Sequence, residues 1–252
     1  MNYQLPIEEY ISQHGFPTFC PKAVLFDMDG VLFDSMPLHA KSWAKVCTGF
    51  GLNMTPEEAY MNEGRTAKST IDILMQRQYG RDATDDEVEK IYAEKCKLFN
   101  AEPEAPKMLG AEQVLENVRA HGLQILVVTG SGQKSLLTRL ETNYPGFFHP
   151  DRVVSSKDVQ YGKPNPEPYL KGLAKAGVHP WEALVVENAP LGVRAGVAAD
   201  IFTIAVNTGP LPESALLQEG ANLLFPSMKA FADAFSKIVD AARAFREGNN
   251  MQ

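Results

Sequence analysis

Short apolar runs rich in Val, Ile and Leu recur along the chain, separated by stretches in which apolar residues return every three or four positions. The short runs are typical of buried strands, and the stretches between them are typical of helices that cover a sheet. Strands that alternate with helices predict a parallel sheet covered on both faces. The predicted strands are 23–26, 124–129, 152–155, 183–187, 201–206 and 222–225.

The interval between the first two predicted strands is far too long for one crossover helix. Thr55 to Glu58 and Thr84 to Glu87 have the spacing of helix capping boxes within it. One helical face follows at Val88, Ile91, Tyr92 and Lys95. We therefore expect an inserted helical domain, bounded by Pro37 and by the proline-containing segment 102–106, that can act as a lid. The predicted domains are an extension at 1–20, a sheet domain at 21–34 with 107–245, and the helical insertion at 35–106.

The first predicted strand ends in Asp27, Asp29 and Gly30. Parallel sheets bind ligands beyond the carboxyl ends of their strands, so both aspartates can reach one metal ion or substrate there. An ionised aspartate attacks phosphorus without a base to activate it, which makes Asp27 the candidate nucleophile. Asp29, on a turn that Gly30 permits, is the candidate general acid and base. An acidic strand end that caps a neighbouring helix is the alternative interpretation.

Two further segments suit a phosphoryl anion. Thr129, Gly130 and Ser131 follow the second predicted strand and offer a hydroxyl and backbone N–H groups where a helix is expected to begin. Lys163 lies in Gly-Lys-Pro-Asn-Pro, whose prolines stiffen the chain, so its ammonium can neutralise charge on phosphoryl oxygens. Helix capping by the first segment and a solvated surface lysine in the second are the alternatives.

Glu187 and Asn188 follow the fourth predicted strand and offer oxygen ligands for a hard cation. Mg²⁺ needs only one or two carboxylates when substrate phosphate and water supply its other ligands. With Asp27 and Asp29, these residues predict a magnesium site at the same edge of the sheet. Helix capping by Asn188 is the alternative.

Composition narrows the class of partner. At 252 residues, 44% of them hydrophobic, the chain can bury a substantial core. Its net charge of -7 disfavours a nucleic-acid or anionic-membrane surface, and no apolar stretch approaches the ~20 residues of a membrane span. Cys20, Cys47 and Cys96 are too scattered for a zinc site or a disulfide framework. The acidic N-terminal segment lacks the pattern of a signal peptide, so we expect a cytoplasmic monomer that acts on a small molecule.

The four segments, in this order and with a helical insertion after the first, resemble the four motifs of the haloacid dehalogenase superfamily, in its phosphotransferase branch with a helical cap. The resemblance implies a Rossmann-like three-layer core, a Mg²⁺ cofactor and an aspartyl-phosphate intermediate. It extends from Ala23 to about Phe231. The motif positions are Asp27 as nucleophile, Asp29 as acid and base, Thr129 in the second motif, Lys163 in the third, and Glu187 with Asn188 in the fourth.

The segment 26–31, the pair His39 and Trp43, and Gly162-Lys-Pro are similar to the β-phosphoglucomutase subclass. That resemblance implies a small phosphorylated metabolite as the partner. The substrate-binding residues expected from it are Gly30, Gly130, Ser131, His39 and Arg65.

Two positions depart from the subclass. Its fourth motif usually ends in Glu-Asp, whereas Asn188 removes one negative charge here, although an amide oxygen can still ligate Mg²⁺. The mutases carry a lysine just before Gly64, where this chain has Glu63. The segment 62–66 instead resembles subclass members that hydrolyse inorganic pyrophosphate. We hypothesise that Glu63 reaches the Mg²⁺ or one of its waters when the cap closes; a solvated glutamate is the alternative.

The expected function is a Mg²⁺-dependent phosphohydrolase, with pyrophosphate as the favoured substrate and other small phosphate esters next. A β-phosphoglucomutase, in which a sugar hydroxyl accepts the phosphoryl group, is the leading alternative. A non-catalytic binding protein of the same fold is disfavoured because the motif residues are all present. Dehalogenation is disfavoured by the second aspartate, Asp29.

Overall fold

The computed structural model describes residues 2–132 and 136–249. Its centre is a parallel sheet with the strand order β3-β2-β1-β4-β5-β6, so β1 lies in the middle. The strands are β1 Ala23–Phe26, β2 Gln124–Val128, β3 Val153–Val154, β4 Ala183–Glu187, β5 Phe202–Val206 and β6 Leu223–Phe225. All lie within the predicted runs, which confirms the α/β fold with a parallel sheet.

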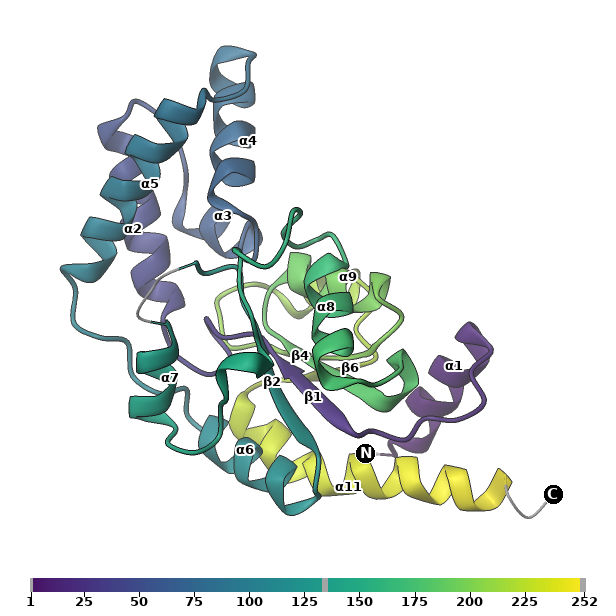
Figure 1. The fold of residues 1–252 in the computed structure, drawn as a ribbon. Coiled ribbons are helices and arrows are strands. Elements are labelled where there is room, and N and C mark those ends of the chain that lie inside the picture. The colour runs from purple at the N-terminus through teal and green to yellow at the C-terminus, as the bar shows by residue number, and fades with distance from the viewer. Residues whose placement is uncertain (1, 133–135, 250–252) are drawn as a thin grey trace.

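Alternating side chains of β1 enter two different cores. Val24 and Phe26 pack into one hydrophobic cluster, and Ala23 and Leu25 pack into another. Because successive residues of a strand point to opposite faces, a run with no polar residue is what a doubly covered sheet requires. Helices α6, α7 and α11 cover the first face and α8 and α9 cover the second (Figure 1). Their bounds are α6 Ala111–Ala120, α7 Leu136–Asn143, α8 Glu167–Ala176, α9 Pro190–Ala198 and α11 Met228–Asn249, and α10 Glu213–Leu217 lies beside β6.

Four helices between β1 and β2 form a separate group, the cap, beyond the carboxyl ends of the strands (Figure 1). They are α2 Met36–Gly49, α3 Pro56–Met61, α4 Ala67–Tyr79 and α5 Asp85–Asn100. The cap has its own hydrophobic cluster, and both predicted capping boxes, at Thr55 and Thr84, are confirmed. The two connections to the sheet run side by side, with Asp34 N bonded to Pro106 O at 3.0 Å and Met108 N to Leu32 O at 2.8 Å.

The N-terminal segment contributes to the sheet domain. Helix α1, Gln4–His14, buries Ile7 and Tyr10 in the cluster that α11 also joins. The Tyr10 hydroxyl donates to the Asp200 carbonyl at 2.8 Å. No helix in the described ranges is both long and apolar enough to cross a membrane.

Candidate active site

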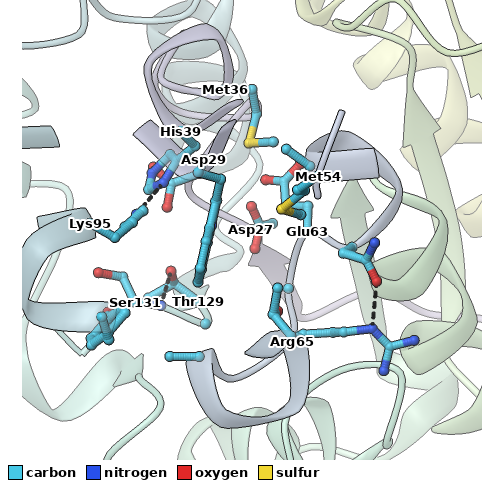
Figure 2. A pocket seen from close by; sticks show the side chains of 18 residues that line it. Asp27, Asp29, Met36, His39, Met54, Glu63, Arg65, Lys95, Thr129 and Ser131 are labelled. Atoms are coloured by element: carbon cyan, nitrogen blue, oxygen red, sulfur yellow. Dashed lines mark hydrogen bonds and ion pairs between the residues drawn. The ribbon is translucent and has the colours of Figure 1, made fainter. Parts of the chain in front are cut away.

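The carboxyl ends of β1, β2 and β4 lie next to one another in the sheet and face the cap. A cavity of about 80 Å³ lies between them and the cap helices. Figure 2 shows Asp27 and Glu63 in its middle, with Asp29, His39 and Lys95 to one side and Thr129 with Ser131 below. The remaining lining is Met36, Trp43, Met54, Ala59, Asn62, Gly64, Arg65, Ala67, Thr70, Tyr92 and Gly130.

Asp27 is buried at the end of β1. Its backbone N–H donates to the Val186 carbonyl at 3.0 Å, so the pairing of β1 with β4 extends to it. The Oδ1 atom accepts a hydrogen bond from Lys163 Nζ at 2.5 Å, whereas Oδ2 has no partner among the described residues. Burial raises the pKa of Asp27 to about 8, with Lys163 opposing and the carboxylates of Glu187 and Asp29 adding to the rise. One oxygen of Asp27 is therefore held and the other is free to react.

Lys163 and Glu187 form a buried pair beneath Asp27. Lys163 Nζ donates to Glu187 Oε1 at 2.6 Å and to the Val128 carbonyl at 3.0 Å. The Tyr169 hydroxyl donates to the same Glu187 oxygen at 2.7 Å. Although burial opposes it, the two carboxylates raise the pKa of Lys163 well above its usual range. The Lys163 ammonium therefore stays charged and in contact with Asp27.

The hydrogen bonds of Glu187 indicate a different role from the predicted one. Its Oε2 accepts from the backbone N–H groups of Asn188 at 3.0 Å and Ala189 at 3.4 Å. Since Oε1 already has two donors, both oxygens are engaged by the protein. The contact that this structure shows is with Lys163, and direct metal contact by Glu187 stays a prediction that would require rearrangement.

Asp29 is joined to two cap helices. Its Oδ1 accepts from Ser35 Oγ at 2.5 Å and lies 3.3 Å from Nε2 of His39, on α2. Lys95, a buried residue of α5, places Nζ 2.7 Å from His39 Nδ1. Burial lowers the pKa of both His39 and Lys95. Although burial alone would raise it, the pKa of Asp29 lies below its usual range because His39 and Ser35 bond to it.

The segment 62–66 between α3 and α4, here called the cap loop, brings Glu63 against the sheet domain. Asn188 Nδ2 donates to Glu63 Oε2 at 3.2 Å, so Asn188 contacts the cap, and the N-cap position of α9 is Ala189, with no side-chain cap. Gly30, with a φ of +87°, makes room for this contact, since a Cβ there would meet Asn188 Nδ2 at 2.0 Å. Burial and the charges of Asp27 and Glu187 raise the pKa of Glu63 well above its usual range.

Three buried oxygens around this point have no hydrogen-bond partner among the described residues: Asp27 Oδ2, Glu63 Oε1 and Asn188 Oδ1. Unpaired buried acceptors are rare and call for an explanation such as an ion. Two carboxylate oxygens and an amide oxygen fit Mg²⁺, which prefers oxygen ligands and completes its shell with water and phosphate. The described residues hold no group of three or more His, Cys, Asp or Glu side chains arranged as a metal site. The donor set fits Mg²⁺ only when Asn188 and non-protein ligands are included.

The anion-binding segment is partly visible. Thr129 is buried, and its hydroxyl accepts from the Ser131 backbone N–H at 3.0 Å. Helix α7 is described from Leu136 onward. The expected helix start after Gly132 lies outside the described residues.

Arg65 lines the cavity but directs its guanidinium away from Asp27 (Figure 2). It bonds to Asn62 Oδ1 at 3.0 Å and to Ser69 Oγ at 3.3 Å. Substrate binding by Arg65 stays a prediction, and in this arrangement it braces the cap loop.

The residues that the sequence did not predict include Ser35, Tyr169 and Lys95, which contact Asp29, Glu187 and His39. Ser35 and Tyr169 are ordinary polar residues with no recognisable spacing. Lys95 did carry a signal in the sequence, because it occupies a helix position otherwise taken by apolar residues. In the structure it is only 3% exposed. A lysine in such a position is rarely buried without a partner.

A model of the haloacid dehalogenase-like hydrolase family matches residues 24–206. The chain belongs to this family. Hexitol phosphatase A of Escherichia coli is 32% identical over 192 residues, which are 74% of this chain and 83% of the phosphatase. A phosphorylated carbohydrates phosphatase of Thermotoga maritima is 30% identical over 207 residues, 79% of this chain and 92% of its own.

A solved structure from Bacteroides vulgatus, of a protein named for beta-phosphoglucomutase, superposes with a TM-score of 0.93. It is 54% identical, and the match covers 96% of this chain and 98% of that one. Together the comparisons confirm an enzyme of the haloacid dehalogenase type with a β-phosphoglucomutase-like fold.

Proposed function

We propose that this enzyme is a Mg²⁺-dependent phosphohydrolase that transfers the phosphoryl group of a small phosphorylated substrate first to Asp27 and then to water. The observation that carries the proposal is the asymmetric setting of Asp27. Lys163 holds Oδ1 at 2.5 Å, while Oδ2 is buried, unpaired among the described residues and at the cavity. A nucleophile needs one oriented oxygen with no competing donor.

In the first half of the reaction, Asp27 Oδ2 forms a bond to phosphorus as the bond to the leaving oxygen breaks. Lys163 and the backbone N–H groups near Thr129 face the negative charge on the phosphoryl oxygens. Asp29 gives its proton to the leaving oxygen. The phosphoryl dianion adds negative charge to the site, which raises the pKa of Asp29 and favours its protonated form.

In the second half, water attacks the aspartyl-phosphate and restores the Asp27 carboxylate. Asp29 takes the proton of that water. The contacts with His39 and Ser35 that lower the pKa of Asp29 support this role, because they stabilise the ionised form from which a base starts. Closure of the cap over a cavity of about 80 Å³ limits which acceptors can reach phosphorus.

Asn188 and Glu63, through their unpaired oxygens, would hold the Mg²⁺ next to Asp27, whose Oδ2 makes the attack on phosphorus. When bound, the ion neutralises charge on the phosphoryl oxygens, and a cation beside Asp27 lowers the pKa of about 8 that burial imposes. Ionised Asp27 is the attacking form, so a cation at this position would also favour the protonation state in which Asp27 attacks.

Phosphorylated carbohydrates are the proposed substrate class. The support comes from the two phosphatases compared above, whose names give carbohydrate or hexitol substrates. The cavity also offers groups that can bond to sugar hydroxyls, namely Asn62, Thr70 and Tyr92.

Inorganic pyrophosphate is the second candidate, and the observation that favours it is Glu63. A carboxylate beside the reaction centre suits a metal-bound small anion, whereas the second phosphate of a sugar bisphosphate needs a cation there. The relatives named above do not support pyrophosphate. Their names favour the carbohydrate class.

A substrate panel tests these alternatives. Phosphate release is measured with hexose phosphates, hexitol phosphates and pyrophosphate, with Mg²⁺ and with chelator. A hydrolase releases phosphate steadily, and the best substrate identifies the class. Interconversion of glucose 1-phosphate and glucose 6-phosphate without net phosphate release would instead identify a mutase.

The covalent step is tested separately. Rapid acid quenching during turnover, followed by borohydride reduction, converts an aspartyl-phosphate to homoserine, which mass spectrometry locates. We expect the mark at Asp27. Its absence during active turnover would reject the covalent mechanism.

A further inference from the structure

The cap touches the sheet domain through glycines on three separate loops. Gly130 follows β2, Gly162 precedes α8 and Gly209 follows β5. A Cβ built on Gly162 would lie 2.9 Å from Thr66 Cγ2 and 3.1 Å from the Thr66 nitrogen. One on Gly130 would lie 3.2 Å from the Gly64 carbonyl oxygen.

Gly209 makes the corresponding contact on the other side of β1. A Cβ there would lie 3.1 Å from both Cδ1 and Cε1 of the Tyr60 ring. Tyr60 belongs to α3, and Thr66 is the N-cap residue of α4. Two of the contacts therefore fall within the cap loop and the third lies just before it, and from this loop Glu63 reaches Asn188.

Backbone conformation does not explain these glycines. None of Gly130, Gly162 and Gly209 has a φ in the left-handed region, unlike Gly30 and Gly64. An alanine could adopt the same φ at each position. The reason for glycine is space, and at Gly162 and Gly209 the nearest atoms that limit that space belong to the cap.

We propose that Gly162 and Gly209, with Gly130 between them, form a seat that positions the closed cap, and that they are positioning residues for the reaction. Their missing side chains let the cap loop approach until Gly64 lies on the Lys163 side chain, where a Cβ on Gly64 would be 2.8 Å from Lys163 Cδ. At that depth Glu63 Oε1 is shielded from solvent beside Asp27. A shallower position would withdraw Glu63 from the reaction centre.

The seat acts only in the closed form. A methyl group on Gly162 or Gly209 meets the cap when the cap closes and meets nothing of the cap when it opens. Substitution therefore shifts the equilibrium toward the open form without removing any reacting group. Its kinetic consequence rests on the proposed function, since only the closed form brings Glu63 to the site.

The test uses Gly162→Ala and Gly209→Ala in the full-length protein. We expect kcat/KM for the best substrate of the panel to fall about 10- to 100-fold in Gly162→Ala, the range that a misplacement of ~1 Å produces. The loss should be smaller in Gly209→Ala, because the Tyr60 ring can turn aside. Thermal stability should be unchanged or slightly raised, because alanine restricts the unfolded chain more than glycine does.

Gly49→Ala is the matched control. Gly49 ends α2 in the cap, and a Cβ there would have nothing within 4 Å. This variant should keep wild-type kcat/KM. A rescue variant adds Thr66→Ser to Gly162→Ala, which removes the clashing Cγ2 but keeps the hydroxyl that accepts from Ser69 N at 3.2 Å. Part of the lost activity should return.

A second measurement does not depend on the reaction. Amide hydrogen exchange of free protein is followed in peptides covering 60–66 and 159–166. Both should exchange faster in Gly162→Ala than in wild type and Gly49→Ala, and Thr66→Ser should partly reverse the change. This readout tests the seat even if no phosphatase activity is found.

Two results would overturn the proposal. One is exchange and kcat/KM in both seat variants equal to those of Gly49→Ala. The other is lost activity with unchanged exchange and no rescue by Thr66→Ser, which would place the damage in the loop of Lys163 rather than in the cap contact.

Discussion

Two carboxylates beside Asp27, Glu187 and Glu63, differ in how completely the protein binds them. Glu187, on the sheet side, has donors on both oxygens, from Lys163, Tyr169 and two backbone N–H groups. Glu63, on the cap side, has one oxygen on Asn188 and the other unpaired among the described residues. The sheet side is thus complete without a ligand, while the cap side needs an additional group.

This difference follows from where the groups originate. All the side-chain contacts of Glu187 come from the sheet domain. Glu187 ends β4, Lys163 lies in the loop before α8, and Tyr169 lies in α8. Glu63 belongs to a loop of another unit and meets Asn188 only across the interface. A charge that must be in place before the substrate binds is best held by the rigid part of a site. A charge that is needed only after closure can come from the part that moves.

Removing the nucleophile should have the largest effect. Asp27→Asn keeps the shape of the side chain but removes the attacking charge, so turnover should fall by about three orders of magnitude or more. Asp240→Asn, an exposed change on α11, is the control. Circular dichroism checks that both variants fold, and substantial turnover in folded Asp27→Asn would show that another group attacks.

Lys95→Met should have the next largest effect, because it removes the cation behind His39 without touching Asp27. Lys95 Nζ lies 2.7 Å from His39 Nδ1, which leaves Nε2–H directed at Asp29. Without it, the pKa of Asp29 and the tautomer of His39 change, and kcat should fall roughly 10- to 100-fold, within the range of general acid and base catalysis. The pH profile of kcat should shift as well.

Lys97→Met, two residues further along α5 and exposed, is the control for Lys95. It should leave both kcat and its pH profile unchanged. If Lys95→Met matches this control, the contact with His39 has only a structural role.

Glu63→Gln tests directly whether the cap-side carboxylate contributes to Mg²⁺ binding. We expect about a 10-fold higher Mg²⁺ concentration for half-maximal activity, since one charged ligand is lost. Stability should change little, because glutamine keeps the shape of the Glu63 side chain and an oxygen that can accept from Asn188 Nδ2. Glu57→Gln, an exposed change on α3, is the control, and superimposable Mg²⁺ titrations of the two variants would make Glu63 a bystander.

Thr84→Ala should have the smallest effect on the site. It removes the capping box of α5, at the end of the cap remote from the cavity, and should cost about 1 kcal/mol in the free energy of unfolding. Thermal unfolding should detect a fall in Tm of roughly 2–4 °C. Unchanged kcat/KM would show that cap stability and cap position are separate properties.

The sequence predicted the architecture because its signals are local. Each strand is a short, mostly apolar run, and both capping boxes need only a threonine and a glutamate three residues apart. Asp27, Asp29, Thr129 and Glu187 could be picked out because they lie at or just beyond strand ends that a parallel sheet brings to one edge. Lys163 could be picked out because prolines stiffen the segment that contains it.

The partners of these residues were not predictable in the same way. Glu187 and Asn188 are adjacent in sequence, yet one turns to Lys163 and the other to the cap. Which oxygen is paired depends on loops that meet only in the folded chain, and no periodic pattern encodes that choice. Ser35 and Tyr169 were missed for the same reason, because only the folded chain brings them to Asp29 and Glu187.

Local signals were enough to predict the order of strands and helices along the chain, the place of the insertion and the residues at the strand ends, because backbone propensity and apolar periodicity act over a few positions. The contact of Glu187 with Lys163, the place of Lys95 next to His39 and the three loop glycines that face the cap became visible only in the folded chain. Those outcomes depend on distances between segments far apart in the chain, and such distances are set by packing.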